Sequence, residues 1–345
     1  MTDSTIRVLV VDDSAFARKV LRQVLSSAPG LTVVDTARDG LDALEKISEL
    51  QPDVVTLDLV MPGLDGLGVL KSLAGAPSPR VVVVSSAGEE SELAVSALQA
   101  GAVDLVHKPT ALATDRLYEL GEELVAKVRL AAQARVRPPV SGEPVTKPAP
   151  VAPARAWKRL VVVGTSTGGP AALTRLLRDL PADFPSPLAL ALHIPAGYTE
   201  ALSRRLDGQS ALEVLEAEDG MELRPGRAVL ARAGLHLKVE REGERAWVRL
   251  DRLPRQMPHH PSVDVLFQSA VAGWGADVVG VVLTGMGDDG LQGAESIRAA
   301  GGLVLTESAD SAVVYGMPRV VKEAKLSHAS APIEEMAALL GRYAR

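Results

Sequence analysis

One serine stands where a hydroxyl could act as a nucleophile, in the stretch Gly164-Thr-Ser166-Thr-Gly-Gly-Pro170. The apolar run Leu160–Val163 before it predicts a buried strand, and the glycines and proline after it allow a helix to begin. Free amides and the positive end of the helix dipole at such a corner favour developing negative charge. Ser166 is therefore a candidate nucleophile for acyl transfer. The same corner also fits a phosphate-binding loop, and Ser166 or Thr167 fits a helix N-cap.

A histidine and two carboxylates follow at comparable positions further along the chain. His193 ends one apolar run, and Asp288 and Asp289 follow another. Because the carboxyl ends of parallel strands meet at one edge of a sheet, we expect Ser166, His193 and one of these two aspartates to lie together. They would serve as nucleophile, general base and the carboxylate that orients the base. The competing histidines are His236, His259, His260 and His328.

A second group of reactive side chains lies in the first third of the chain, where five short apolar runs alternate with amphipathic segments. This alternation predicts a doubly wound parallel sheet. Its expected strand ends carry Asp12, Asp13, Asp58, Ser86 and Lys108. Carboxylate oxygens suit Mg²⁺, and Asp58 is the best candidate for accepting a phosphoryl group. Taken singly, each of these side chains also fits a simple loop cap.

The composition restricts the class of protein. A chain of 345 residues exceeds the usual size of one domain and predicts two. The formal net charge of −6, without a basic stripe, argues against a nucleic-acid partner. The absence of cysteine excludes disulfides and thiolate metal sites. The N-terminus is polar and the sequence has no apolar run of about 18 residues, so we expect a cytoplasmic protein without direct membrane insertion.

Both domains are expected to be α/β, with doubly wound parallel sheets. Residues 135–154 are dense in proline and have no apolar periodicity, which indicates a semi-extended linker. We expect one domain at residues 1–130, the linker at 131–158 and a second, Rossmann-like domain at 159–345. Within the second domain, a small antiparallel β excursion is expected from Ala228–Leu230, Leu235–Glu240 and Ala246–Leu250.

The first domain, over about Ile6 to Val128, resembles a bacterial response-regulator receiver domain. The motifs are Val10-Val-Asp12-Asp13-Ser, Asp58-Leu-Val-Met-Pro-Gly-Leu-Asp-Gly, Val84-Ser-Ser86 and Lys108-Pro109. The resemblance implies a flavodoxin-like fold in which Asp58 is phosphorylated by a chemotaxis histidine kinase. It implies Mg²⁺ held by Asp12, Asp13 and Asp58, and switching through Ser86 with Lys108. It also suggests a cis peptide at Lys108-Pro109, which the sequence leaves open.

The second domain, from about Leu160 to Tyr343, resembles the chemotaxis protein-glutamate methylesterase family. The motifs are Gly164-Thr-Ser166-Thr-Gly-Gly-Pro, His193-Ile-Pro, Pro261-Ser-Val-Asp-Val-Leu-Phe, Leu283-Thr-Gly-Met-Gly-Asp-Asp-Gly and Tyr315-Gly-Met-Pro. The resemblance implies that Ser166 is the nucleophile, His193 the base and Asp289 the acid of the triad. It also implies that the backbone at Thr167 and Met286 holds the oxyanion, and that ester hydrolysis needs no metal.

Together the two resemblances imply phosphorylation-activated hydrolysis of glutamate methyl esters on methyl-accepting chemotaxis receptors, with deamidation of receptor glutamines. They imply recruitment to membrane receptor arrays through partners. A phosphorylation-gated receptor- or kinase-binding module without hydrolase activity is the alternative.

Three features of the second domain keep other assignments open. Asp288 stands where many members of that family carry Asn, which leaves the triad acid open by one residue. Thr165 stands where they more often have Ala. The serine motif also matches the nucleophile elbow of α/β-hydrolases, a rival that would recruit Asp264 or Asp310 with His328.

Overall fold

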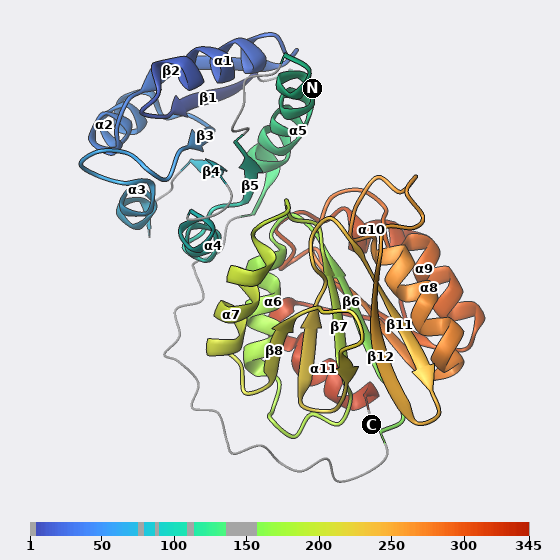
Figure 1. Ribbon diagram of the computed structural model, residues 1–345. Coiled ribbons are helices and arrows are strands. Elements are labelled where there is room, and N and C mark those ends of the chain that lie inside the picture. Colours follow the sequence, from blue (N-terminus) through green and yellow to red (C-terminus); the bar gives the residue numbers. More distant parts are fainter. Residues whose placement is uncertain (1–4, 75–78, 87–89, 109–113, 136–156, 345) are drawn as a thin grey trace. The chain divides into compact units, whose positions relative to one another are not determined.

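The computed structural model describes residues 5–74, 79–86, 90–108, 114–135 and 157–344. The chain divides into two compact units, Met1–Pro139 and Val140–Arg345. Each unit is an α/β body built on a parallel sheet (Figure 1). Most of the linker expected at residues 131–158, and the Lys108-Pro109 peptide, lie outside the described residues. Within the described part of the chain, no helix has the length and apolar character needed to cross a bilayer.

Strands and helices alternate through the first unit. They are β1 (Ile6–Val11), α1 (Ala15–Ser26), β2 (Leu31–Ala37), α2 (Gly40–Leu50), β3 (Val54–Leu57), α3 (Gly66–Leu73), β4 (Arg80–Ser85), α4 (Ser91–Gln99), β5 (Asp104–His107) and α5 (Thr114–Gln133). All strand pairs are parallel, in the order β2-β1-β3-β4-β5, which confirms the predicted doubly wound sheet. Val11 pairs with Leu57, so β1 and β3 end level with each other. The acidic residues that follow these two strands therefore meet at one edge.

The second unit contains a seven-stranded parallel sheet in the order β15-β14-β13-β6-β7-β10-β8. Its strands are β6 (Leu160–Thr165), β7 (Leu188–Leu192), β8 (Glu213–Glu216), β10 (Arg227–Leu230), β13 (Val278–Val282), β14 (Leu303–Glu307) and β15 (Ala329–Ala331). Its helices are α6 (Gly169–Asp179), α7 (Thr199–Gly208), α8 (Val263–Trp274), α9 (Leu291–Ala299), α10 (Met317–Glu323) and α11 (Ile333–Tyr343), with a short 3₁₀ turn at Gly275–Asp277.

The order of strands reverses at β6, which pairs with β7 on one side and β13 on the other. Gly164 lies opposite Val282 of β13 and Ala191 of β7, so the three strands end at one level. In open parallel sheets, ligands bind outside the carboxyl ends of the strands at such a reversal point. The loops after β6, β7 and β13 are therefore the expected place for a site.

The antiparallel excursion is a three-stranded sheet of β9 (Glu222–Leu223), β11 (His236–Glu242) and β12 (Arg245–Asp251), in the order β11-β12-β9. The predicted hairpin between β11 and β12 is confirmed. The assignment of Ala228–Leu230 to this excursion is wrong, because that run forms β10 of the parallel sheet, between β7 and β8. The run is wholly apolar and fully buried, as a strand covered on both faces requires.

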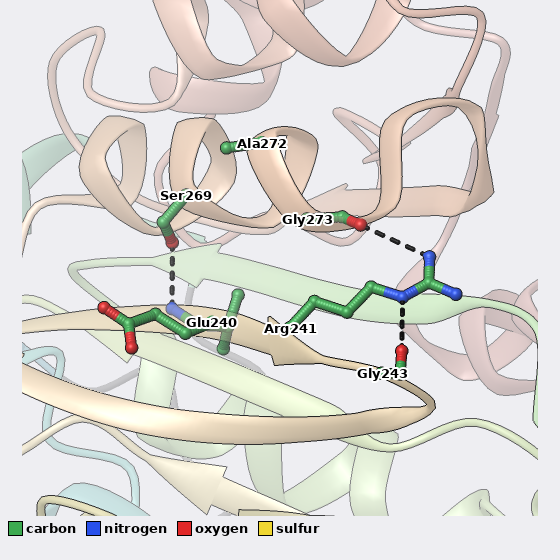
Figure 2. Close-up of a pocket in the computed structure, with 7 residues that line it drawn as sticks. Glu240, Arg241, Gly243, Ser269, Ala272 and Gly273 are labelled. Atoms are coloured by element: carbon green, nitrogen blue, oxygen red, sulfur yellow. Dashed lines mark hydrogen bonds between the residues drawn. The ribbon is translucent and has the colours of Figure 1, made fainter.

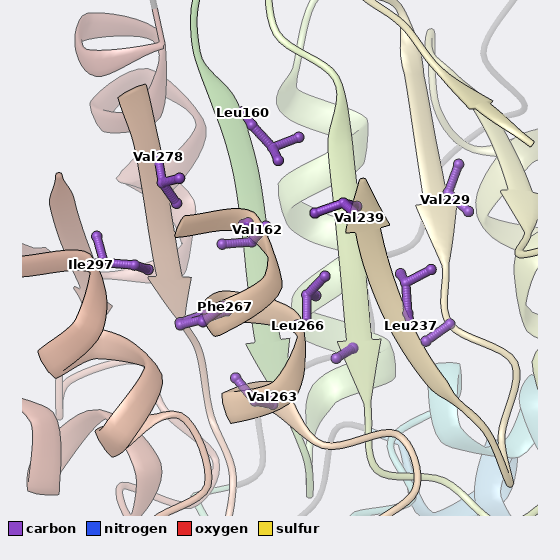
Figure 3. Packing of buried hydrophobic residues seen from close by; sticks show 14 of the residues in the cluster. Leu160, Val162, Val229, Leu237, Val239, Val263, Leu266, Phe267, Val278 and Ile297 are labelled. Carbon is purple, nitrogen blue, oxygen red and sulfur yellow. The ribbon is translucent and has the colours of Figure 1, made fainter. Parts of the chain in front are cut away.

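Helix α8 packs against both the parallel sheet and β11. Figure 3 shows Val263, Leu266 and Phe267 of α8 among the buried side chains of the second unit, which include Val162 of β6 and Leu237 of β11. All five side chains are fully buried. Close packing on two sides leaves the N-terminus of α8 little freedom to move, so it is a rigid platform for the residues around it.

Candidate active site and acidic receiver site

Ser166 lies at the corner between β6 and α6. Its N–H donates to the Thr284 carbonyl at 3.0 Å, and its own carbonyl accepts from the Gly169 N–H at 2.7 Å. The N-cap of α6 is Gly168, at φ 79°, so Ser166 does not cap this helix. A Cβ on Gly168 would lie 2.7 Å from Cβ of Val313, so only glycine fits here. The corner therefore leaves the Ser166 hydroxyl without a capping role.

Thr284, which follows β13 closely, ties its loop to the serine corner. Its carbonyl also accepts from Oγ1 of Thr165 at 2.7 Å, and its hydroxyl donates to the Thr167 carbonyl at 2.9 Å. The Thr284 N–H donates to the buried Glu307 carboxylate at 2.8 Å. Thr284 makes these hydrogen bonds with both its main chain and its side chain. The loop after β13 is therefore held in a fixed position relative to the loop after β6. Thr165, where the related family more often has Ala, thus contributes a contact of its own.

Gly285 lets this loop approach the serine closely. A Cβ at this position would lie 2.8 Å from Cβ of Ser166 and 2.3 Å from Sδ of Met317. Such distances are below those that real Cβ atoms tolerate, so glycine is required for the approach. Met286 follows directly, and its side chain is 38% exposed. The backbone of the loop thus passes beside Ser166 while the Met286 side chain faces outward.

His193 and Asp289 form a hydrogen bond that joins the ends of β7 and β13. Nε2 of His193 lies 2.7 Å from Oδ2 of Asp289, and the two side chains are only 8% and 9% exposed. The His193 N–H donates to the Thr165 carbonyl at 3.1 Å, which sets the histidine beside the serine corner. Asp288 is exposed and makes no such contact among the described residues. Of the two adjacent aspartates, Asp289 is therefore the hydrogen-bond partner of the histidine.

The imidazole tautomer follows from this pairing. A carboxylate accepts hydrogen bonds, so Nε2 carries the proton that is donated to Asp289. Nδ1 of His193 is buried and has no hydrogen-bond partner among the described residues. Within this part of the chain, the hydrogen bond of the His193 ring goes to Asp289 and none joins the ring to Ser166. The free lone pair of the ring is therefore on Nδ1.

Asp289 also caps helix α8. Its Oδ2 accepts from the Val263 N–H at 2.8 Å, and its Oδ1 accepts from the Asp264 N–H and the Ser262 hydroxyl, both at 2.9 Å. Burial acts to raise the pKa of Asp289, but the hydrogen bond from His193, with those from the helix amides, outweighs it and lowers the pKa to about 2. Asp289 is therefore ionised over the whole neutral range.

Asp264 caps the neighbouring helix in return. Its Oδ1 accepts from the Gly290 N–H at 2.9 Å and the Gly293 N–H at 2.7 Å, at the start of α9. Burial, together with the charge of Asp289, raises the pKa of Asp264 to about 6, although the two amides oppose this. Asp289 therefore caps α8, the helix that contains Asp264, and Asp264 caps α9, the helix that follows Asp289.

The α/β-hydrolase rival requires His328 near the serine, and the structure places it elsewhere. His328 directly precedes β15, at the amino end of that strand, whereas Ser166 follows the carboxyl end of β6. Its N–H donates to the Val304 carbonyl, and its ring meets Tyr343 edge to face at 5.1 Å. Because the sheet is parallel, these two ends lie on opposite edges. The rival arrangement is therefore wrong.

Two other histidines stack on rings near the site. The His259 ring lies 4.0 Å from that of His193, with 22° between the planes. The adjacent His260 stacks on His236 at 4.3 Å, with 35° between the planes. The sequence named His259 and His260 only as competitors for the role of base. Their stacking could not be anticipated, because the segment that carries them has no regular secondary structure.

In the first unit, Lys108 joins two of the predicted carboxylates. Its Nζ lies 2.7 Å from Oδ2 of Asp12 and 2.9 Å from Oδ2 of Asp58. Oδ1 of Asp58 accepts from the Leu59 N–H at 2.8 Å. Asp12 and Asp58 are buried and Asp13 is exposed, yet one carboxylate oxygen of each lies within 4.8 Å of the others. Three hard oxygen donors at this spacing fit a divalent cation such as Mg²⁺.

Burial and charge act in opposite directions on this site. Burial raises the pKa of Asp58, and the hydrogen bond and charge of Lys108 only partly offset it. Burial lowers the pKa of Lys108, but Asp12 and Asp58 outweigh it and the net pKa is raised. Lys108 is therefore a permanent cation in direct contact with Asp58.

Ser86 lies beside this site, half-buried, at the end of β4. Its N–H donates to Oε2 of Glu90 at 2.8 Å, and Ser85 donates its hydroxyl to the same oxygen at 2.8 Å. The sequence motif indicated Ser86 but not Glu90, because Glu90 belongs to no recognisable pattern. Glu90 thus holds the backbone from which the Ser86 hydroxyl extends.

Figure 2 shows a groove of the second unit between β11 and α8. Its polar atoms are bonded within the chain: Ser269 accepts from the Val239 N–H at 3.1 Å, and Arg241 donates to the carbonyls of Gly243 and Gly273. The groove is lined by the late part of β11 and of α8, whereas Ser262 and Asp289 lie at the beginning of α8. It therefore contributes nothing to the candidate active site.

Comparison with known proteins finds one matching family in each unit. The CheB methylesterase family matches residues 161–340, and the response regulator receiver domain family matches residues 8–119. The protein-glutamate methylesterase/protein-glutamine glutaminase 5 of Myxococcus xanthus is 73% identical over 347 residues, which cover 99% of this chain and 99% of the relative. A protein-glutamate methylesterase/protein-glutamine glutaminase of Symbiobacterium thermophilum is 44% identical, over 98% of this chain and 96% of the relative.

Among solved structures, the catalytic domain of the Thermotoga maritima CheB methylesterase matches with a TM-score of 0.52 and 35% identity. The match covers 53% of this chain and 97% of that domain. The residue-level geometry, the family matches and the full-length relatives therefore lead to one assignment. The chain belongs to the CheB methylesterase family and carries a response regulator receiver domain in its N-terminal unit.

Proposed function

We propose that this chain hydrolyses glutamate methyl esters on methyl-accepting chemotaxis receptors, deamidates receptor glutamines at equivalent sites, and is activated by phosphorylation of its receiver unit. The 2.7 Å hydrogen bond between His193 and Asp289, beside the Ser166 corner, is the observation that carries this proposal. The names of the two relatives support the substrate class. Receptors and a histidine kinase would be its partners, and they would recruit it to membrane receptor arrays.

In the proposed reaction, Oγ of Ser166 attacks the ester carbonyl carbon while Nδ1 of His193 takes the hydroxyl proton. The Asp289 carboxylate stabilises the imidazolium that forms and keeps the ring in its tautomer. The backbone N–H groups of Thr167 and Met286 donate to the tetrahedral oxyanion. Collapse of the intermediate breaks the carbon–oxygen bond, and the proton held by His193 leaves with methanol.

Water completes the cycle by the same route. Nδ1 of His193 takes a proton from water, the hydroxide attacks the acyl-Ser166 carbonyl, and the proton returns to Oγ as the glutamate carboxylate is released. For glutamine the first leaving group is ammonia in place of methanol. These steps use only side chains and amides of this chain, so we expect hydrolysis to proceed without a metal.

For the receiver unit we propose that Asp58 accepts a phosphoryl group from a histidine kinase. Asp12, Asp13 and Asp58 would hold Mg²⁺, which when bound neutralises charge on the phosphoryl oxygens. Lys108 already contacts Asp58 at 2.9 Å and would pair with the added phosphoryl oxygens. The Ser86 hydroxyl would complete the switch.

We also propose boundaries for the domains of the chain. We place the receiver domain at residues 1–130, the linker at 131–158 and the catalytic domain at 159–345. The separation into two compact units between Pro139 and Val140 supports a linker in this region.

Methanol release from methylated receptors by the purified full-length protein tests the catalytic proposal. Ser166→Ala and His193→Ala should each lower kcat by several orders of magnitude, and the double variant should be little worse, because triad members act as a unit. Asp289→Ala should cost somewhat less. Asp288→Ala is the matched control and should keep nearly full turnover. Normal turnover by Ser166→Ala would end the serine-hydrolase proposal and favour a binding module without hydrolase activity.

Transfer of phosphate from a kinase or a small phosphodonor tests the receiver proposal. Asp58→Asn should abolish Mg²⁺-dependent labelling, and chelation of Mg²⁺ should prevent labelling of the wild type. Asp65→Asn is the control, since Asp65 caps α3 and Asn caps helices equally well. Labelling of Asp58→Asn at the wild-type level would reject Asp58 as the acceptor.

A further inference from the structure

Ser262 makes hydrogen bonds on two sides at the N-terminus of α8. Its hydroxyl donates to Oδ1 of Asp289 at 2.9 Å, on the side of the candidate triad. Its N–H donates to Nδ1 of His236 at 3.1 Å, on the opposite side. Ser262 is 1% exposed and His236 is fully buried. The contact between them is therefore protected from water, and its geometry is set by the protein alone.

The hydrogen bonds of His236 define its state. Nδ1 can accept from the Ser262 N–H only if it carries no proton, so the proton is on Nε2. Nε2 donates to the Pro254 carbonyl at 3.1 Å. Burial lowers the pKa of His236, which favours this neutral ring. The groups that face it are the stacked His260 ring and the charges of Lys238 and Asp289.

We propose that His236 and Ser262 are positioning residues for the Asp289–His193 pair. His236 fixes the Ser262 backbone through Nδ1, Ser262 fixes the Asp289 carboxylate through its hydroxyl, and Asp289 fixes the ring of His193. The proposal rests on the proposed function, and neither residue touches the substrate.

The carboxylate of Asp289 illustrates why this support is needed. Its four donors are His193, Ser262 and the amides of Val263 and Asp264. Only His193 belongs to the reacting groups, and the other three come from the start of α8. Since Asp289 stands in a loop and not in a helix or strand, its orientation depends on that platform. Ser262 supplies the one side-chain donor of the platform and is itself held by His236.

Two substitutions of His236 separate its role as an acceptor from its role in packing. In His236→Asn, the amide oxygen can take the place of Nδ1 and accept from the Ser262 N–H. In His236→Leu the ring volume is roughly kept but the acceptor is lost. We expect kcat for methyl ester hydrolysis by the full-length protein to stay within about threefold in His236→Asn. In His236→Leu we expect kcat to fall about tenfold or more with KM unchanged.

Ser262→Ala should lower kcat to a similar degree, and the double variant with His236→Leu should be no worse than either single one. A second measurement reports positioning without turnover. The imidazole N–H that His193 donates to Asp289 should give a low-field proton resonance. This resonance should move or broaden in His236→Leu and be retained in His236→Asn. Tryptophan fluorescence during urea unfolding checks that each variant is folded.

The outcomes distinguish this proposal from the proposed function. If the wild type releases no methanol, the proposed function fails, while the resonance still tests the positioning. If the wild type is active and folded His236→Leu keeps both its kcat and its resonance, the positioning proposal is overturned. It is also overturned if folded His236→Asn loses as much activity as His236→Leu, because packing and not the acceptor would then be responsible.

Discussion

Replacing Asp264 with Asn should stabilise the catalytic unit at pH 8 and stabilise it less at pH 5, where only about half of the linked penalty has developed. Asp264 is 5% exposed and caps α9 through Oδ1, an atom that Asn retains. The ionised Asp264 carboxylate destabilises the folded state, because burial and the charge of Asp289 disfavour ionisation and raise its pKa from 3.8 to about 6. Asn keeps the cap and removes the charge.

The magnitude and the sign follow from the linkage between proton binding and folding. Between pH 4 and pH 6 the folded state binds a proton at Asp264 that the unfolded chain has released, so the free energy of unfolding falls as the pH rises. A shift of about two pKa units corresponds to about 3 kcal/mol, reached above pH 6. An amide oxygen accepts from the two glycine N–H groups less strongly than a carboxylate. The net gain of Asp264→Asn at pH 8 should therefore be about 1–3 kcal/mol.

Urea unfolding followed by tryptophan fluorescence measures this gain in the full-length protein. All three tryptophans, Trp157, Trp247 and Trp274, belong to the second unit, so the signal reports on that unit alone. Asp288→Asn is the control, because it removes a charge from an exposed neighbour and should change stability by less than about 0.5 kcal/mol. A gain of equal size at pH 5 and pH 8, or a loss at pH 8, would show that the buried charge of Asp264 does not destabilise the unit.

Two further predictions concern the placement of the reacting groups, and both are measured by methanol release with a folding check. Gly285→Ala should lower kcat by about tenfold or more, because the added Cβ would displace Ser166. Gly341→Ala is the control and should leave kcat unchanged, because nothing lies within 4 Å of a Cβ at that position. Equal effects of the two substitutions on kcat would contradict this prediction. His259→Ala should lower kcat about fivefold by freeing the His193 ring, and His259→Phe should restore the stack and most of the rate. If His259→Phe loses activity and His259→Ala does not, stacking on the His193 ring is excluded as the cause.

Residue pattern was enough to predict the fold class and the sheet edge that carries each candidate site. Short β-branched runs can be buried on both faces only in parallel sheets with helical crossovers, so the two α/β units followed from pattern. In parallel sheets the residues after consecutive strands meet at one edge, which made Asp12 and Asp58 candidates in the first unit and Ser166, His193 and the Asp288–Asp289 pair candidates in the second. This inference needs only the direction of each strand.

Sequence pattern could not decide which strand pairs with which. Ala228–Leu230 is too short to indicate its partner, and the packed structure shows that it enters the parallel sheet as β10. The final segments β15, α10 and α11 were likewise not predicted. Short runs of small residues carry little periodic signal, and their burial depends on the surfaces that they meet.

The hydrogen-bond pairing of the polar atoms in the site depends on three-dimensional packing and could not be predicted. Asp288 and Asp289 are chemically identical and adjacent, and the choice between them rests on which one the turn after β13 directs toward His193 and α8. The exchange of caps between Asp264 and Asp289 and the support from His236 join segments that lie 25 residues or more apart in the chain. Hydrogen bonds require distances near 3 Å and defined angles, which sequence spacing does not specify across separate elements. The packing of α8 against the sheet and β11 supplies that geometry.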